Sequence, residues 1–591
     1  MFFLAHIIKK TKSVNGILLV ILMVTMLVPF STFGVSSAAY PDDPSPLSIK
    51  WTGFVAGGGE ALLTCDVLPG TLGEEVFHAG GGYKPAQSGG SVTCLNGING
   101  TVIWKTGQGG VPALLDRIGD TCQIHMVDMD LDGTMEIVVP LQSPAGLYIL
   151  NAESGTVQAS FTSVGGGRID SSPVSGDVDG DGYPDLYIGV MAYVNDATTG
   201  KIIHYEYNGN SIVERGRVQV WHPCAGGLSL CDTDHDGTVE LYMNERDIYY
   251  NGEGTTWDGS YGRGITSFWA ENLTKRWQVY DWGASSNIPM LADVNNDGII
   301  DVVTTDLSRS VCVLNSTDGH PLMNGAITLS GSNNRANHYQ SSIYDIDRDG
   351  NLEIVSGDGY ESRNDYVSVW DLWDWTLDAR IDTTAVETKD NNGAVVSTRS
   401  WKGPTFGEVT GDGMMDMLVV TFTQEDDDSP TVNNGTLQIY SWNIANKEFD
   451  LVHLNYGLRH RAIDAVVQDV DRNDDGLNEV LVLTQGGQIV CFESNGIASS
   501  PRARSEIQFY SELRNGASEN IPYEQPYPII KQASPGQLAI NVATSTTQLR
   551  FTLDHPLDLL MDYTVTCTPD IITGGESGND VGNGQRIVNI A

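Results

Sequence analysis

Short runs of alternating apolar and polar residues recur along most of the chain. Segments such as EIVVP, DLYIGV and EVLVL are each followed by a second run, such as GLYILNAESG, and a third, such as KRWQVY. Gly or Asp often lies at the turns between the runs. Short runs with this alternation and these turn residues predict antiparallel β-strands. A further run before each unit, as in SSPVSGDV, brings the predicted unit to four strands.

An acidic motif, D-x-[DN]-x-D-G-x-x-[DE], precedes the second strand of each predicted unit. The intervals between successive copies are 49, 55, 61, 52, 63 and 63 residues. A more degenerate copy, which keeps Asp66, Gly73 and Glu75, lies 62 residues before the first of these. The copies, of which the one at Glu408 is weak, begin at Asp128, Asp177, Asp232, Asp293, Asp345, Glu408 and Asp471.

Four-stranded units at this spacing predict a β-propeller, in which radial repetition leaves only short, protected strand edges. We therefore expect an all-β fold, with an eight-bladed β-propeller over residues 40–520. Seven blades are the alternative, if the unit around Asp66 supplies only closing strands. A Pro-rich linker follows residue 520, and residues 521–591 then predict a short or truncated β-sandwich segment.

The acidic motif has the chemistry of a calcium loop. Side-chain oxygens at positions 1, 3 and 5, a carbonyl at position 7 and a carboxylate at position 9 converge on one cation, and Gly at position 6 permits the sharp turn. Such hard oxygen ligands favour Ca²⁺ over soft metals. The loop differs from an EF-hand because none of the seven copies has a carboxylate at position 12. Asp-Gly turns that only connect strands are the alternative, but seven copies in register favour ion binding.

The sequence thus predicts up to seven calcium sites. Their expected ligands are Asp128, Asp130, Asp132, Thr134 and Glu136; Asp177, Asp179, Asp181, Tyr183 and Asp185; Asp232, Asp234, Asp236, Thr238 and Glu240; Asp293, Asn295, Asp297, Ile299 and Asp301; Asp345, Asp347, Asp349, Asn351 and Glu353; Glu408, Thr410, Asp412, Met414 and Asp416; and Asp471, Asn473, Asp475, Leu477 and Glu479.

The charge of the chain agrees with bound cations and excludes several partners. The chain of 591 residues carries 33 Lys+Arg against 75 Asp+Glu, a formal net charge of −42. Such a surface does not favour nucleic acid or anionic membranes, which bind through basic patches. Hydrophobic residues make up 40% of the chain, which argues against intrinsic disorder.

The first 39 residues predict a signal peptide. Lys9, Lys10 and Lys12 precede an apolar run over residues 17–28, and small residues then lead to a cleavage position after Ala39. We therefore expect a secreted or cell-surface protein with no membrane insertion after cleavage. An uncleaved N-terminal anchor is the alternative.

The eight cysteines follow the repeat rather than a disulfide framework. Cys94, Cys312 and Cys491 occupy equivalent strand positions, and residues in equivalent places of separate repeats rarely approach to disulfide distance. We expect most of the cysteines to be small core residues. Cys224 and Cys231 are the pair most suited to a disulfide.

The acidic loops and their flanking strands resemble the FG-GAP/VCBS repeat family, which includes the propellers of integrin α-subunits. The resemblance covers roughly residues 55–500, and Phe406-Gly407 is the clearest trace of the Phe-Gly signature. It implies a propeller fold with Ca²⁺ at the blades. The runs LYILNAESGTVQASF and SVTCLNGINGTVIW look like repeats of quinoprotein-type eight-bladed propellers. The C-terminal strands resemble immunoglobulin-like modules of prokaryotic surface proteins.

Function is less directly indicated, because propellers serve many activities. The leading hypothesis is an adhesion or interaction scaffold for a glycan or protein, with Trp370, Trp373 and Trp375 as candidate contacts; packing between blades is the alternative role of these tryptophans. A second hypothesis is a calcium-dependent polysaccharide lyase similar to rhamnogalacturonan lyases, with bases at Arg459–Arg461 or Asn337–Tyr339. A structural cell-envelope component is the third. No catalytic residue set is assigned, and the sequence leans away from an enzyme.

Overall fold

The computed structural model describes the chain from residue 47 onward, with gaps. The chain divides into residues 1–38, which lie outside the described part, and residues 39–591. The described residues are 47–56, 62–68, 73–80, 90–111, 113–114, 117–118, 124–143, 145–167, 169, 171–191, 200–220, 223–234, 236–245, 264–280, 288–295, 297–305, 310–322, 327–328, 336–347, 351–358, 366–382, 398–400, 404–411, 416–423, 433–443, 446–471, 477–497, 529–534, 547–554, 561–564, 572–574, 577–581 and 584–590.

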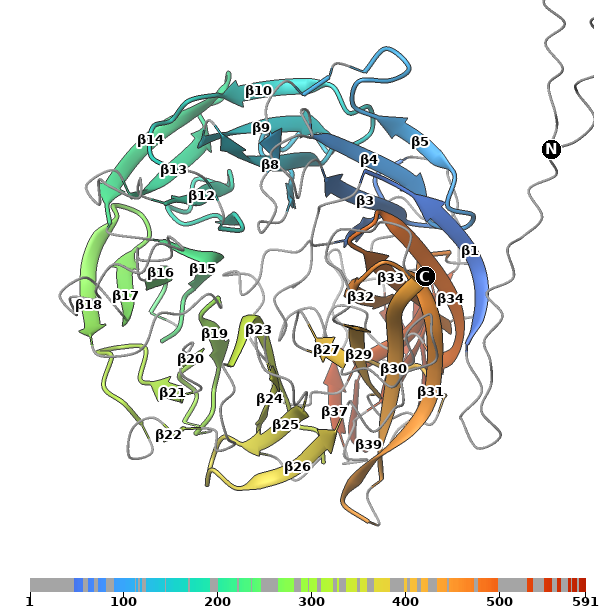
Figure 1. The fold of residues 1–591 in the computed structure, drawn as a ribbon. Coiled ribbons are helices and arrows are strands. Elements are labelled where there is room, and N and C mark those ends of the chain that lie inside the picture. Colours follow the sequence, from blue (N-terminus) through green and yellow to red (C-terminus); the bar gives the residue numbers. More distant parts are fainter. Residues whose placement is uncertain are drawn as a thin grey trace, which may run out of the picture. The chain divides into compact units, whose positions relative to one another are not determined.

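Eight small antiparallel sheets form an eight-bladed β-propeller, as the repeat spacing predicts (Figure 1). No helix occurs among the described residues. The first four blades consist of β2 (Leu62–Cys65), β3 (Glu75–Gly80), β4 (Ser91–Asn96) and β5 (Val102–Lys105); β6 (Arg117–Ile118), β7 (His125–Val127), β8 (Glu136–Ser143), β9 (Ala145–Asn151) and β10 (Val157–Phe161); β11 (Val174–Gly176), β12 (Asp185–Val190), β13 (Lys201–Tyr207) and β14 (Ile212–Gln219); and β15 (Pro223–Cys231), β16 (Glu240–Glu245), β17 (Gly264–Trp269) and β18 (Thr274–Tyr280).

The second half of the ring repeats this pattern, and we number the blades 1 to 8 in chain order. Blades 5 to 8 consist of β19 (Met290–Ala292), β20 (Asp301–Thr305), β21 (Ser310–Leu314) and β22 (Ile327–Thr328); β23 (Ala336–Tyr344), β24 (Glu353–Asp358), β25 (Tyr366–Asp371) and β26 (Leu377–Asp382); β27 (Thr398–Ser400), β28 (Thr405–Gly407), β29 (Asp416–Thr423), β30 (Asn433–Asn443) and β31 (Glu448–Arg459); and β32 (Ala462–Gln468), β33 (Leu477–Thr484), β34 (Gln488–Ile497) and β1 (Ser48–Phe54).

The ring is closed by a strand from the other end of the propeller segment. Strand β1 is the outermost strand of blade 8 and pairs antiparallel with β34. Blade 8 thus combines three late strands with one early strand, and the unit around Asp66 forms the complete blade 1. Eight blades are therefore present, and the seven-bladed alternative is wrong.

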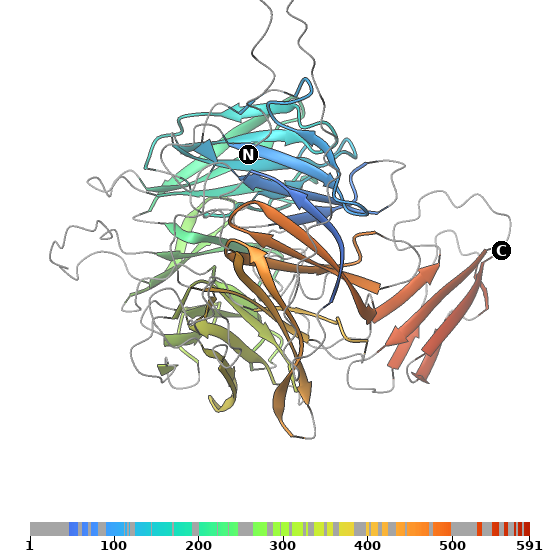
Figure 2. The ribbon, with the colours of Figure 1, turned by 45° about the vertical axis from the view of Figure 1, so that its right-hand side comes forward.

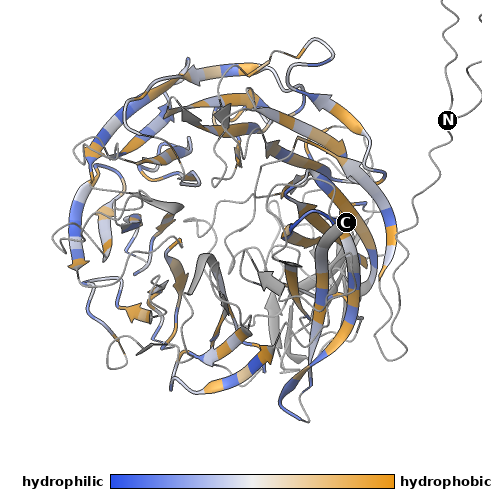
Figure 3. Cartoon of the chain, viewed as in Figure 1, coloured by the Kyte–Doolittle hydropathy of each residue, from blue (hydrophilic) through white to orange (hydrophobic). Residues whose placement is uncertain are grey.

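The hydrophobic core lies between adjacent blades. The buried cluster around Tyr242 joins Cys231 of blade 4 to Val302 and Leu314 of blade 5. Apolar residues alternate with polar ones along the outer strands and dominate the inner strands, as the hydropathy colouring shows (Figure 3). This agrees with two-sided burial of the inner strands and one-sided burial of the outer ones.

Three of the cysteines confirm the predicted core positions. Cys94, Cys312 and Cys491 are buried in β4, β21 and β34 and form no disulfide. Cys231 is also buried, whereas the side chain of Cys224 lies outside the described residues. Cys231 forms no disulfide, and it lies at the opposite end of β15 from Cys224, so a disulfide between the two is contradicted.

Indole side chains link successive blades. Trp104 on the outer strand of blade 1 donates Nε1–H to the carbonyl of Ala152, in the turn between β9 and β10 of blade 2, at 3.0 Å. Trp51 of blade 8 donates Nε1–H to the Gly97 carbonyl of blade 1 at 2.7 Å. Trp277 of blade 4 donates Nε1–H to the Ser316 carbonyl of blade 5 at 2.8 Å. Each indole therefore ties an outer strand to the next blade's outermost turn.

A left-handed glycine in each of these turns makes room for the indole. Gly155 has φ +68°, and a Cβ there would lie 2.6 Å from the ring of Trp104. Gly100 and Gly319 have φ of +69° and +75° and lie equally close to Trp51 and Trp277. The glycine thus meets two requirements, a conformation that side chains disfavour and a close approach to a ring.

Six further strands follow the ring. They form a four-stranded sheet of order β35-β36-β40-β38 and a two-stranded sheet of β37 and β39, shown in Figure 2 as sheets of their own. Their bounds are β35 (Ile529–Ser534), β36 (Thr547–Asp554), β37 (Met561–Thr564), β38 (Ile572–Gly574), β39 (Ser577–Val581) and β40 (Gly584–Ile590). The predicted immunoglobulin-like character of this segment stays a prediction.

The described residues contain no helix long and apolar enough to cross a membrane. The predicted signal peptide, residues 1–39, lies outside the described part of the chain. Its cleavage and the resulting location of the protein therefore stay predictions.

The contact between Gly155 and Trp104 can be separated from backbone strain by a matched pair of variants. Gly209, in the turn between β13 and β14, has φ +81° and no atom within 4 Å of a built Cβ. We expect Gly209→Ala to lower the free energy of unfolding by roughly 1–2 kcal/mol through strain alone. Gly155→Ala should cost about 1–3 kcal/mol more, because the methyl group overpacks the indole. Denaturant unfolding measures both, and equal losses would contradict the indole contact.

Candidate metal centres

All the acidic loops occupy the same place in the fold. Each of the seven loops, and the degenerate loop at Asp66, connects the innermost strand of a blade to the second strand. Because every blade is built in the same order from the inside outward, these connections lie on one face of the ring. The position of these acidic turns, directly before the second strand of each blade, agrees with the prediction from the sequence motif.

Loops of neighbouring blades contact one another. The amide of Ile300, in the Asp293 loop, donates to the carbonyl of Thr233, in the Asp232 loop, at 2.9 Å. The side chain of Asn478 donates to the carbonyl of Glu408 at 3.0 Å. The amide of Glu74 donates to the carbonyl of Val470 at 2.7 Å, which joins blade 1 to blade 8. Each of these bonds joins the loop of one blade directly to the loop of the next.

Four loops have the same internal pattern of hydrogen bonds. In the Asp128 loop, the Gly133 amide donates to Asp128 Oδ2 at 3.1 Å, and the Thr134 amide donates to Asp132 Oδ1 at 2.8 Å. Gly133 has φ +88°, the left-handed conformation that position 6 requires. The corresponding donor–acceptor pairs in the other three loops are Gly182–Asp177, Tyr183–Asp181, Gly237–Asp232, Thr238–Asp236, Gly298–Asp293 and Ile299–Asp297.

The carboxylate at position 9 is buried and held by the loop's own backbone. Met129 at position 2 donates its amide hydrogen to Glu136 Oε2 at 2.8 Å, and Glu136 is fully buried. The same bond recurs as Val178–Asp185, Thr233–Glu240, Val294–Asp301, Ile346–Glu353 and Val409–Asp416. One oxygen of each carboxylate is thereby fixed, and the other is directed toward the remaining acids of the loop or the strands beside it.

Three loops bring carboxylates together at the spacing of a cation site. Asp128, Asp130 and Glu136 each offer an oxygen within 4.8 Å of the other two, as do the triads Asp177, Asp179 and Asp185, and Asp232, Asp234 and Glu240. Oxygens that surround one Ca²⁺ at about 2.3–2.6 Å fall within this spread. Three of the five predicted ligands thus lie close together in each of these loops.

Buried oxygens without a partner mark several of these loops. Among the described residues, Asp128 Oδ1, Asp130 Oδ1 and Glu136 Oε1 are buried and have no hydrogen-bond donor. Asp234 Oδ1 and Asp301 Oδ1 are in the same situation. A buried carboxylate oxygen with no donor carries a desolvation cost that a bound cation would relieve. The donor set therefore fits a hard divalent cation.

Burial makes these carboxylates weak acids when no cation is bound. It raises the pKa of Glu136 and of Asp301 to about 7 and the pKa of Glu353 to about 10. Burial and repulsion from Asp132 and Asp128 also raise the pKa of Asp130. The neutral form is thus favoured in the absence of a compensating positive charge.

Both oxygens of the Asp416 carboxylate of blade 7 accept hydrogen bonds. Oδ2 accepts from the amides of Val409 and Thr410 at 2.8 and 2.9 Å, and Oδ1 accepts from the hydroxyl of Ser441 at 2.6 Å. This is the loop with the weakest sequence match. Both oxygens of Asp185 in blade 3 are likewise engaged, by the Val178 amide and by His204 Nε2.

The last loop is aligned differently from the prediction. Val470 donates its amide hydrogen to Glu479 Oε2 at 3.0 Å and is fully buried, like the position-2 residues of the other loops. Position 1 therefore corresponds to Asp469 rather than Asp471, and the loop is two residues longer than the others. Lys50 of β1 contacts both Asp471 and Glu479, with Nζ 2.8 Å from Glu479 Oε1.

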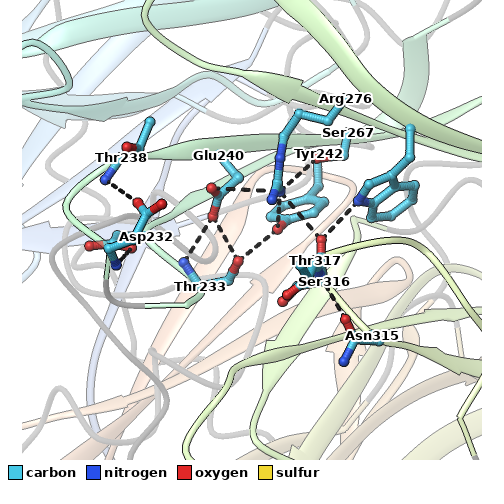
Figure 4. Close-up of polar contacts among 12 residues, drawn as sticks. Asp232, Thr233, Thr238, Glu240, Tyr242, Ser267, Arg276, Asn315, Ser316 and Thr317 are labelled. Carbon is cyan, nitrogen blue, oxygen red and sulfur yellow. Dashed lines mark hydrogen bonds and ion pairs between the residues drawn. The ribbon is translucent and has the colours of Figure 1, made fainter.

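A basic residue also lies beside the Asp232 loop. Arg276 of β18 places Nη1 3.6 Å from Glu240 Oε1, and its guanidinium stacks over Trp269 at 4.2 Å. Figure 4 shows Arg276 between the loop and the turn of blade 5, where it donates to the Ser316 carbonyl at 3.3 Å. The sequence motif did not reveal Lys50 or Arg276; the signal available was a basic residue directly before a repeated tryptophan.

Some predicted ligands remain untested. Asp349, Asp412, Met414, Asn473 and Asp475 lie outside the described residues. The predicted roles of the position-7 carbonyls also stay predictions.

The tryptophans singled out in the sequence take different positions. Trp370 is buried at 9% exposure, and Trp375 packs against the same cluster between blades 5 and 6. Trp373 is 45% exposed, in the turn between β25 and β26. Packing between blades thus describes two of the three, and Trp373 is available for contact with a partner.

The base-like clusters lie away from the loops of their own blades. Arg459–Arg461 precede β32, whereas the acidic loop follows that strand. Asn337–Tyr339 lie near the start of β23, and the Asp345 loop follows its end. A strand of 7 residues spans roughly 20 Å or more. Neither cluster is therefore placed beside the acidic loop that follows it in the sequence.

Residues 128–188 match the family model of the FG-GAP-like repeat. This segment contains the loops at Asp128 and Asp177 with the strands between them. No curated protein matches the sequence.

Solved structures of several propellers are similar in fold. Sqt1 of Saccharomyces cerevisiae is 11% identical, with a TM-score of 0.47, over 76% of this chain and 99% of that chain. A rhamnogalacturonan lyase of Bacillus licheniformis is 12% identical, with a TM-score of 0.46, over 81% and 83%. The quinohemoprotein alcohol dehydrogenase of Comamonas testosteroni is 11% identical, with a TM-score of 0.46, over 76% and 77%.

The raised pKa values predict an unusual pH dependence in chelator. Glu136, Asp301 and Glu353 bind protons more tightly when folded than when unfolded, so the metal-free fold should lose stability as pH rises from about 4.5 through 7. We expect the melting temperature in excess chelator to fall by several degrees between pH 5 and pH 7.5. Excess calcium should remove or reverse this trend, since it favours the ionised form. A chelated protein that grows steadily more stable over this range would contradict the assignment.

Proposed function

We propose that the protein is a calcium-binding β-propeller that acts outside the cytoplasm as an interaction scaffold for a glycan or protein. The observation that carries the calcium assignment is the convergence of buried carboxylate oxygens without donors in the acidic loops. Each bound ion would neutralise like charges and relieve the desolvation of these oxygens. The FG-GAP-like repeat over residues 128–188 supports the same assignment.

The scaffold role is supported by how the loops are connected. The acidic loops lie on one face and contact their neighbours through Ile300–Thr233, Asn478–Glu408 and Glu74–Val470. Bound calcium would therefore fix the relative positions of successive blades and stiffen the surface that the loops form. Trp373 offers an exposed aromatic side chain of the kind that contacts sugar rings and protein partners.

The second candidate is a calcium-dependent polysaccharide lyase. A lyase requires a base beside the calcium-bound substrate. The candidate bases at Arg459–Arg461 and Asn337–Tyr339 lie at the opposite ends of β32 and β23 from the following loops. This arrangement favours the scaffold over the enzyme, and a structural cell-envelope role is the remaining alternative.

Substitution of a buried ligand tests the calcium assignment. Glu136→Gln removes the charge of a carboxylate whose pKa burial already raises, so we expect it to melt in chelator at or above the wild-type temperature. The increase in melting temperature on addition of calcium should be smaller than in wild type by several degrees, because one site is lost. Glu153→Gln, in the turn after β9 of the same blade, is the control and should respond to calcium as wild type does. An undiminished response of Glu136→Gln would contradict a site at this loop.

A panel of acidic and neutral polysaccharides tests the scaffold role. We expect the full chain to be retained on at least one glycan in calcium, without formation of unsaturated products, and to be released by chelator. Retention and ultraviolet absorbance of the products are recorded in the same incubation. Products that disappear on chelation would establish a lyase instead. Neither retention nor products would leave a protein partner or an envelope role.

A further inference from the structure

A β-bulge recurs in the outer strand of seven blades. The bulge has the same position in each blade. The residue that follows the loop's last carboxylate pairs with a residue of the third strand, and the extra residue of the outer strand lies beside that third-strand residue. In blade 2 this extra residue is Gln158, opposite Leu150, which pairs with Ile137. The extra residues of the seven blades in chain order are Ile103, Gln158, Arg215, Arg276, Asp378, Val452 and Lys50.

The bulge directs a side chain toward the loop from outside. A β-bulge leaves one residue unpaired and re-aims its side chain. Lys50 reaches Glu479 Oε1 at 2.8 Å, and Arg276 lies 3.6 Å from Glu240 Oε1. In both blades the bulge residue approaches the oxygen that the position-2 amide leaves open. In blade 2 the extra residue, Gln158, reaches Glu136 with its side chain but carries no charge.

Lys50 places a positive charge directly between two carboxylates of the last loop. Its ammonium bridges the carboxylates of Asp471 and Glu479, which are 4% and 3% exposed, and its own side chain is 16% exposed. A lysine ammonium is a compact positive charge, and Nζ contacts both carboxylates. A second cation placed between these carboxylates would be repelled by it.

We propose that the Lys50 ammonium, presented by the bulge of the outer strand β1, replaces the calcium ion in the last loop. This inference rests on the calcium binding proposed above. It assigns the last loop a tethered cation on β1, so the closing strand is held to blade 8 without calcium, whereas the loops of blades 2 to 6 use the ion.

Reciprocal exchange of the two bulge residues tests the inference. Equilibrium dialysis with Ca²⁺ gives the number of ions bound per full chain. We expect Lys50→Gln to bind one ion more than wild type and Gln158→Lys to bind one fewer. Ile103→Gln changes the bulge residue of blade 1, whose loop has lost the intermediate carboxylates, and is the control with an unchanged number.

Thermal unfolding in excess chelator is the second readout. Lys50→Gln should melt below wild type, with calcium restoring the loss, because two buried carboxylates then lack a cation. Gln158→Lys should melt above wild type in chelator and gain less from calcium. If Lys50→Gln does not fold, the result for Gln158→Lys decides.

If wild type binds calcium but both exchange variants bind the same number of ions as wild type, the inference about the bulge residue is overturned and the proposed calcium binding is not. A wild type that binds no calcium would overturn both this inference and the proposed function.

Discussion

The buried carboxylate at the end of each acidic loop is the feature on which the rest of the propeller depends. It lies at the first residue of the second strand, between the inner strand and the outer part of the blade, and one of its oxygens accepts the position-2 amide, as in Glu136 and Met129. This bond shapes the loop. The charge it buries must be balanced by a proton, a side chain or a metal ion.

The same loops organise contacts around the ring. Met135 at position 8 accepts the amide of Ala152, and the carbonyl of Ala152 accepts the indole N–H of Trp104 from the preceding blade. A similar pair of hydrogen bonds joins blades 3 and 4. The amide of Ala270 donates to the carbonyl of Val239, and the carbonyl of Ala270 accepts from the Tyr187 hydroxyl. The acidic turn of one blade is thus connected by two hydrogen bonds to the previous blade, and on the proposed calcium binding, loss of an ion would loosen a contact between blades as well as a turn.

The repeat could be predicted from the sequence because its determinants are local. Alternating apolar residues, Asp-Gly turns and a spacing near one blade act within a few residues of each other, and they predicted the eight blades and the loop positions. Lys50 could not be found this way, because its partners Asp471 and Glu479 are more than 400 positions away in the chain. The register of the last loop was assigned wrongly for a related reason. Only the copy that begins at Asp471 has Gly at position 6 and an acid at position 9, and the bond from the Val470 amide to Glu479, which indicates Asp469 instead, forms only in the folded blade.

Diffraction from crystals grown with calcium would test the central claim most directly, because anomalous scattering locates each ion. The account predicts anomalous peaks within the loops that begin at Asp128, Asp177, Asp232, Asp293 and Asp345, each beside the position-9 carboxylate. It predicts no peak between Asp471 and Glu479, where the Lys50 ammonium lies. Well-ordered acidic loops without any peak would contradict it, as would an ion between Asp471 and Glu479 with Lys50 displaced.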